Sequence, residues 1–173
     1  MNRLQQAVVW LRRIGHCRGF GIQSPSDYRF VRYVVNEHWP YYAYEKLGTG
    51  DDWLRCKLGR LFFRLANYLQ PDSIADLLGY EDYLHAGCRK AAISRDLLPQ
   101  ANLILAPAQT GLAALLAQCT AKTVFVVEDI GHHPEVWKSI LTDSRAVVTF
   151  DLYYCGIAFF DARQSKHHYT INF

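Results

Sequence analysis

Acidic and imidazole side chains that could do chemistry lie close together in the segment "VEDIGHHPEVW", residues 127–137. Glu128 and Asp129 stand at the end of an apolar run, and His132 and His133 follow directly. Carboxylates beside imidazoles can share a proton or bind a divalent metal. Asp129 and His132 are the candidate catalytic pair, and no metal site is assigned. Neighbouring histidines point in different directions, which argues against a joint role for His132 and His133. The alternative is that Asp129 only caps the turn after it.

A second candidate site lies in "DSIADLLGYEDYLHAGCRKA", residues 72–91. Asp76 belongs to an apolar run that resembles a buried strand, and Gly79 and Tyr80 begin the loop after it. A nucleotide-binding loop needs several small residues so that its backbone can approach the ligand. This loop has one glycine at its start and then tyrosines and acids, which argues against a dinucleotide site.

The elements that would position these residues alternate between strand and helix from residue 72 to the end of the sequence. Apolar runs at 73–78, 102–107 and 123–129 are typical of strands buried on both faces of a parallel sheet. Helices are expected at roughly 82–96, 111–119 and 134–143. Ligands bind beyond the carboxyl ends of such strands, where both candidate sites lie. An α/β fold with right-handed crossovers follows.

The last part of the sequence predicts antiparallel pairing. "AVVTFDLYY" and "GIAFFDA" are separated by very little, so a hairpin is expected around Cys155–Gly156. The final segment "HHYTINF" could add one further strand. There, alternation along a strand would turn one of His167 and His168 outward and the other inward.

Residues 1–70 read as helices, in one domain with residues 71–173. Ser24 is placed to cap a helix, Pro25 suits its first position, and Asp27 is acidic in its first turn. A later helix begins after Asp51 and Asp52, which suit its positive end, and Pro71 ends it.

Composition limits the classes of function. The chain has 173 residues, of which 50% are hydrophobic, and a net charge of +3, so it can bury a core and has no strong charge bias. Its five scattered cysteines contain no C-x-x-C pair, which favours free thiols in a reducing compartment, the cytoplasm. No segment approaches the ~20 apolar residues that span a bilayer, and no membrane partner is expected. The basic residues near the start read as a solvated helix face rather than a nucleic-acid patch.

Four stretches resemble a group of class I S-adenosylmethionine (SAM)-dependent methyltransferase-like proteins from Bacteroidetes. "GFGIQSPSDYRFV" looks like the "HGIHSPFVY" segment of that family, and "PYYAYEKL" looks like its aromatic connector. "FFRLANYLQPDSIADLLG" resembles the helix and first strand that lead to the SAM loop. "VVEDIGHHPEVW", with the tail "DLYYCGIAFFDARQSKHHYTINF", resembles the late strand and closing hairpin. The resemblance implies a Rossmann-like methyltransferase sheet, mainly parallel, with a C-terminal antiparallel hairpin.

The sequence departs from the family at the cofactor loop. The family pattern E-x-G-x-x-x-G places small residues against SAM, whereas here Asp76 stands at or beside the acid, Gly79 remains and Tyr80 begins a bulky run. About 22 residues separate Gly79 from Asn102, enough for one helix. The resemblance therefore implies strand order 1-4-5-7-6, without strands 2 and 3. The next strand ends in "APAQT", without the acid that binds Mg²⁺ in related metal-dependent methyltransferases.

These departures favour a degenerate methyltransferase-like protein with weak or no SAM binding, acting as a binding or assembly protein. The loop around Asp76, Gly79 and Tyr80 would be a vestigial SAM loop, with Tyr80 and Tyr83 filling the space. One alternative is an active SAM-dependent methyltransferase of unknown acceptor, and another is an unrelated α/β enzyme that uses Glu128, Asp129 and His132. Without strands 2 and 3 the edge at 73–78 is exposed, so a helix, a second copy or a protein partner should cover it.

Overall fold

The computed structural model describes residues 3–96, 100–108 and 111–173. It is an α/β protein with one seven-stranded mixed sheet, in the order β2-β1-β3-β4-β6-β5-β7. Four of the six strand pairings are parallel, and β6 is antiparallel to both of its neighbours. The strands are β1 (Ser73–Asp76), β2 (Ala92–Ser94), β3 (Leu103–Pro107), β4 (Val124–Glu128), β5 (Val148–Asp151), β6 (Cys155–Phe159) and β7 (His167–Thr170).

Helices make up most of the first seventy residues and connect the parallel strands. The α-helices are α1 (Arg3–Arg12), α2 (Pro25–Phe30), α3 (Trp53–Leu69), α4 (Glu81–Gly87), α5 (Leu112–Ala117) and α6 (Pro134–Thr142). Shorter helical turns are η1 (Ile14–Gly19), the π-helical η2 (Val31–Val35) and η3 (Tyr42–Glu45). The expected caps are present, since the side chain of Ser24 accepts a hydrogen bond from the backbone of Asp27 and Asp52 caps α3 in the same way.

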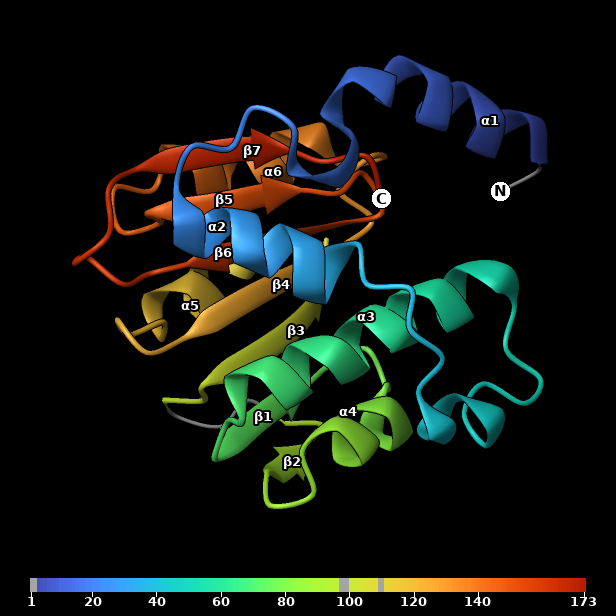
Figure 1. Ribbon diagram of the computed structural model, residues 1–173. Coiled ribbons are helices and arrows are strands. Elements are labelled where there is room, and N and C mark those ends of the chain that lie inside the picture. The colour runs from blue at the N-terminus through green and yellow to red at the C-terminus, as the bar shows by residue number, and fades with distance from the viewer. Residues whose placement is uncertain (1–2, 97–99, 109–110) are drawn as a thin grey trace.

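The sheet lies between two layers of helices. One hydrophobic cluster packs α2, η2, α3 and α4 against one face, and the other packs α5 and α6 against the opposite face. Figure 1 shows α2, α3 and α4 in front of the strands, while α1 stands apart from the sheet. Because both faces of the central strands are covered, β3 and β4 are apolar along almost their whole length.

We expected an open sheet edge at residues 73–78, and this prediction is wrong. The helix expected at 82–96 ends at Gly87, Cys88 is extended, and the chain forms the short strand β2. This strand pairs in parallel with β1, with Ile74 opposite Ile93. The sheet therefore has a strand outside β1, and the prediction that this position is empty is corrected. The central order β1-β3-β4-β6-β5 agrees with the expected order of five strands.

The hairpin is present, but its turn lies earlier than expected. Asp151 is opposite Gly156, so Leu152–Tyr154 make the turn, where Tyr153 has a φ of 69°. Cys155 and Gly156 belong to β6 instead. Gly156 allows the ring of Trp137 in α6 to pack directly on the strand, because a Cβ atom there would overlap that ring. The predicted last strand is present as β7 and pairs in parallel with β5.

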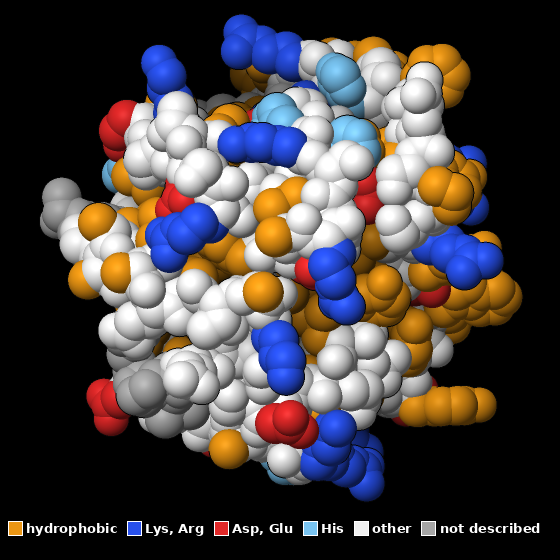
Figure 2. Space-filling view, turned by 90° about the vertical axis from the view of Figure 1, so that its left-hand side faces the viewer, with side chains coloured by type: hydrophobic (Ala, Val, Ile, Leu, Met, Phe, Trp, Pro, Cys, Tyr) orange, Lys and Arg blue, Asp and Glu red, His pale blue; other side chains and the backbone are white. Residues whose placement is uncertain are grey.

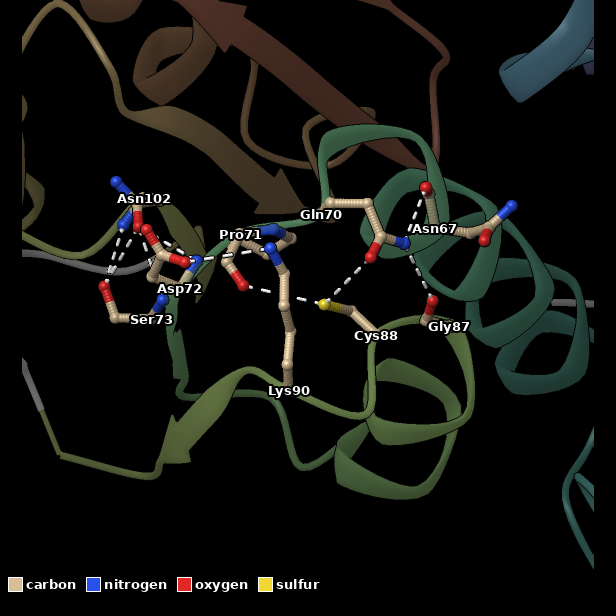
Figure 3. Close-up of polar contacts among 9 residues, drawn as sticks. All are labelled: Asn67, Gln70, Pro71, Asp72, Ser73, Gly87, Cys88, Lys90 and Asn102. Carbon is tan, nitrogen blue, oxygen red and sulfur yellow. Dashed lines mark hydrogen bonds and ion pairs between the residues drawn. The ribbon is translucent and has the colours of Figure 1, made fainter.

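Polar contacts attach the start of β1 to its neighbours (Figure 3). The side-chain oxygen of Asn102 accepts hydrogen bonds from the backbone N–H groups of Asp72 and Ser73, at 3.2 and 3.3 Å. The side-chain amide of Gln70 at the end of α3 donates to the carbonyl of Gly87 at 3.4 Å. These contacts fix α3, β1 and α4 relative to one another, and α3 and β1 carry residues of the candidate site.

The surface offers no continuous basic area on the face in Figure 2, where Lys and Arg side chains are scattered among polar and hydrophobic atoms. Near the start of the chain, Arg13 forms an ion pair with Asp151 at 2.9 Å and is therefore not part of a free basic patch. Within the described ranges, no helix combines the length and the apolar character needed to cross a membrane.

Candidate functional site

The candidate site lies at the carboxyl ends of β1 and β4, where a parallel α/β sheet places its ligands. Asp76 is the last residue of β1 and Glu128 is the last residue of β4. The strand β3 lies between them and pairs with both. The loop that follows β1, and the first half of α3, close over this end of the sheet.

Asp76 organises the loop after β1 through its own side chain. Its Oδ1 atom accepts hydrogen bonds from the backbone of Leu78 at 3.2 Å and of Gly79 at 2.9 Å. Its Oδ2 atom is buried and has no hydrogen-bond partner among the described residues. Burial raises the pKa of Asp76 above its usual range, and the loop N–H groups offset part of this rise. The carboxylate therefore acts inward on its own loop.

Tyr80 fills the space above the strand ends. It is only 2% exposed, and its hydroxyl donates a hydrogen bond to Oε1 of Glu128 at 3.2 Å. The guanidinium of Arg55 lies 4.4 Å from the centre of the Tyr80 ring, and Phe62 of α3 meets that ring edge to face. Two residues of α3 and one residue of β4 thus hold the tyrosine in place.

The network continues from Arg55 to Tyr83. Arg55 donates to the carbonyl of Gly79 and pairs with Asp51 at 3.2 Å. The hydroxyl of Tyr83, which is 4% exposed, donates to the other oxygen of Asp51 at 2.9 Å. The two tyrosines, the arginine and the two acids form one connected set, in which each buried polar group has a partner.

Electrostatics of the set follow from its burial. Desolvation raises the pKa of Glu128, while the hydrogen bond from Tyr80 and the charge of Arg55 act in the opposite direction. The pKa of Tyr80 is raised mainly by burial and then by the neighbouring Glu128. Tyr80 is therefore a neutral donor at ordinary pH, and it does not act as a base there.

Asp129 and His132 are brought together, as the sequence predicts, but at a separate and exposed position. His132 Nδ1 lies 2.6 Å from Asp129 Oδ1, and their side chains are 64% and 52% exposed. His133 lies 3.7 Å from the same carboxylate. Asp129 also has a φ of 67° and donates its backbone N–H to Tyr154, which shows its structural use in the turn after β4. Both side chains face solvent, which weakens any proton-sharing role.

No metal centre forms from these residues. In the parts of the chain that the structure describes, no group of three or more His, Cys, Asp or Glu side chains is arranged to hold a metal ion. In the loop after β3, Gln109 and Thr110 lie outside the described residues.

The histidines of the last strand face opposite sides, as alternation predicts. His167 lies 3.5 Å from Asp27, whereas the Nδ1 atom of His168 lies 2.9 Å from the hydroxyl of Thr149. Both have structural partners.

Sequence reasoning missed Arg55 and the partner role of Asp51. Asp51 was interpreted only as an acid at the start of a helix, where the helix dipole favours it, and Arg55 only as part of that helix. The signal that could have found them is their spacing, because residues four apart on a helix share a face.

Comparison of the chain with protein-family models, curated proteins and solved structures found no match.

Proposed function

We propose that the protein is a methyltransferase-like protein with a closed cofactor crevice, which acts as a binding or assembly protein rather than as a methyltransferase. The observation that carries this proposal is the position of Tyr80. Its ring lies buried beyond the end of β1, between Arg55 and Phe62, and its hydroxyl bonds Glu128. In the family that the sequence resembles, the loop after the first strand carries small residues that admit SAM.

The residues of the loop do not fit SAM. The cofactor needs space for its methionine end next to the loop backbone, and the buried Tyr80 that follows Gly79 in this loop argues against such a space. Asp76, the residue nearest to the acid of the family pattern, directs Oδ1 to its own loop backbone. Binding would require Tyr80 to leave Glu128 and Arg55, and each such buried polar contact costs ~1–3 kcal/mol when broken.

The binding role is assigned to the groove that Gly79, Tyr80 and Tyr83 help to line, and not to the sheet edge. The edge strand β2 is only three residues long, so another chain could form few hydrogen bonds with it. The groove has a volume of about 970 Å³ and opens between α3, α4 and the segment before α3. Its charged side chains have both signs: Lys46, Arg55 and Arg89, with Asp51, Glu81 and Asp82. Mixed charges of this kind suit a protein surface.

The thiols support an intracellular site of action. All five cysteines are free, and a chain of this kind persists in a reducing compartment such as the cytoplasm.

The test is isothermal titration of the protein with SAM and with its demethylated product. We expect no binding tighter than about millimolar for the natural sequence. Tyr80→Gly, which opens the space beyond β1, should bind measurably better if the ring is what excludes the cofactor. Tyr42→Ala is the matched control, since Tyr42 is 92% exposed and touches none of the network.

A micromolar dissociation constant for the natural sequence would reject the closed crevice and restore an active SAM-dependent methyltransferase of unknown acceptor. The oligomeric state of the same samples should be measured by size-exclusion chromatography with light scattering. A dimer that survives dilution and is lost on Ser94→Pro would return the binding role to the edge at β2.

A further inference from the structure

A second hollow lies on the other side of α3, away from the closed crevice. It has a volume of about 530 Å³, and its walls come from α1, α3, the turn before β6 and the last residue of the sequence. Figure 1 shows α1, the beginning of α3 and the C-terminal end of the chain on one side of the molecule. The aromatic side chains in its walls are Trp10, Trp53, Tyr154 and Phe173.

Lys57 is the one charged residue among the side chains that line this hollow. Its Nζ atom lies 4.1 Å from the centre of the Phe173 ring and 5.4 Å from the centre of the Trp53 ring. The amine makes no hydrogen bond or ion pair with any residue that the structure describes. Three N–H donors therefore stand among aromatic rings without an acceptor from the protein.

The neighbouring groove has two carboxylates in its walls, Glu37 and Glu45, but the described residues show no ion pair between either of them and Lys57. It has a volume of about 990 Å³ and shares Trp53, Lys57 and Phe173 with the hollow. The guanidinium of the nearby Arg64 donates hydrogen bonds to the carbonyls of Val34 and Val35, at 2.6 and 3.1 Å, and to the hydroxyl of Tyr44. Burial and then the charge of Arg64 lower the pKa of Lys57 to about 8. The protein thus holds a cation in a place that favours it less than water does.

We propose that this hollow, here called the Lys57 site, binds a flat aromatic group that carries a carboxylate or phosphate. Lys57 pairs with the anion, and Trp10 and Trp53 contact the ring. The volume lies in the range of small-molecule pockets, which combine apolar walls with few polar groups. Trp53 already meets Tyr154 edge to face at 5.7 Å, so the walls are arranged for ring contacts.

The same chemistry has two sources: a free aromatic acid or phosphate, and the C-terminal aromatic residue of a peptide. The Lys57 site shares no residue with the network of Tyr80, so this inference goes beyond the proposed function and does not depend on it.

The probes are N-acetyl-phenylalanine, its neutral amide N-acetyl-phenylalaninamide, phenyl phosphate and adenosine monophosphate. Binding is followed by tryptophan fluorescence and by the NMR signal of the lysine side chain next to the amine. We expect the free acid or the phosphates to bind at least tenfold more tightly than the amide, with the pKa of Lys57 raised in the complex. Tighter binding of a phosphate indicates a small metabolite, and tighter binding of the N-acetylated acid indicates a peptide end.

Three variants complete the test. Lys57→Met should lose the preference for the acid over the amide, and Trp10→Ala should weaken binding of both probes. Lys138→Met, which removes an exposed lysine of α6, should leave all constants unchanged, and thermal melts establish that each variant is folded. Equal binding of acid and amide, unchanged binding by Lys57→Met, or no binding of any probe at about 10 mM would each overturn the proposal.

Discussion

The hydroxyl of Tyr80 lies 3.2 Å from the carboxylate of Glu128, and this contact joins the loop after β1 to the end of β4. The two residues are 48 positions apart in the sequence. Their pairing links the carboxyl ends of β1 and β4, and it gives the partly buried Glu128 a hydrogen-bond donor. The same side chain fills space at the end of β1 and joins two distant segments of the fold.

Substitution of Tyr80 separates these two roles. Tyr80→Phe keeps the ring and removes the donor to Glu128, so it should lower the free energy of unfolding by about 1–2 kcal/mol. Tyr80→Ala also removes the buried ring and should cost about 3–5 kcal/mol. Urea denaturation measures both, with Tyr42→Ala as the exposed control. Equal losses for Phe and Ala would show that the ring is not packed as described.

Gly59 in α3 gives a second test of the same packing. A Cβ atom at this position would lie 2.5 Å from the Tyr83 ring, closer than atoms can approach without movement. Gly59→Ala normally favours a helix by ~1 kcal/mol, but here we expect it to destabilise the protein by about 1–3 kcal/mol. Chemical denaturation gives the value.

The control for Gly59 is a double-mutant cycle with Tyr83→Leu. The smaller side chain makes room for the new methyl group, so Gly59→Ala should cost less in that background. If the cost of Gly59→Ala is the same in both backgrounds, the close contact with Tyr83 does not cause it.

Much of the sheet could be predicted because its signals are local. The apolar runs of β1, β3 and β4 need no partner information to be recognised, and Ser24 with Pro25 marks the start of α2. The hairpin follows from the short distance between its strands. We predicted the turn at Gly156 because glycine is common in turns. In the structure Gly156 lies in β6, where the lack of a side chain lets Trp137 pack against the strand.

The rest depends on contacts between distant residues. The strand β2 has three residues, too few to show alternation, and it forms because β1 offers an open ladder to pair with. The lack of small residues in the loop predicted that Tyr80 and Tyr83 fill the space there, and the burial of both side chains agrees with this prediction. The position of Arg55 over Tyr80, or of Lys57 over Phe173, leaves no trace in local sequence, because it arises from packing between segments that are distant in the sequence.

The exposed pair of Asp129 and His132 calls for a test that separates backbone geometry from charge. Asp129 has a φ of 67°, which glycine adopts freely and alanine does not. Asp129→Ala should lower stability by about 1 kcal/mol, whereas Asp129→Gly should stay within ~0.5 kcal/mol of the natural protein. Thermal unfolding compares the two. If Gly costs as much as Ala, the side-chain contact with His132 contributes the stability and the backbone does not.

The charge of Lys57 should destabilise the protein at neutral pH, and this destabilisation should disappear as the pH rises. Its pKa is about 8 in the folded state and near 10.5 in the unfolded chain, so between these values the unfolded state binds more protons. Stability therefore increases with pH across that window, and below about pH 8 the full cost of the buried charge remains.

Lys57→Met, which keeps the apolar stem and removes the charge, should raise the free energy of unfolding at pH 7 by about 1–3 kcal/mol. The advantage should shrink between pH 8 and 10.5, as followed by urea denaturation at a series of pH values, and Lys138→Met should show no such trend. A Lys57→Met variant that is less stable than the natural protein at pH 7 would mean that the amine has a stabilising partner, and the aromatic hollow would then not hold an uncompensated cation.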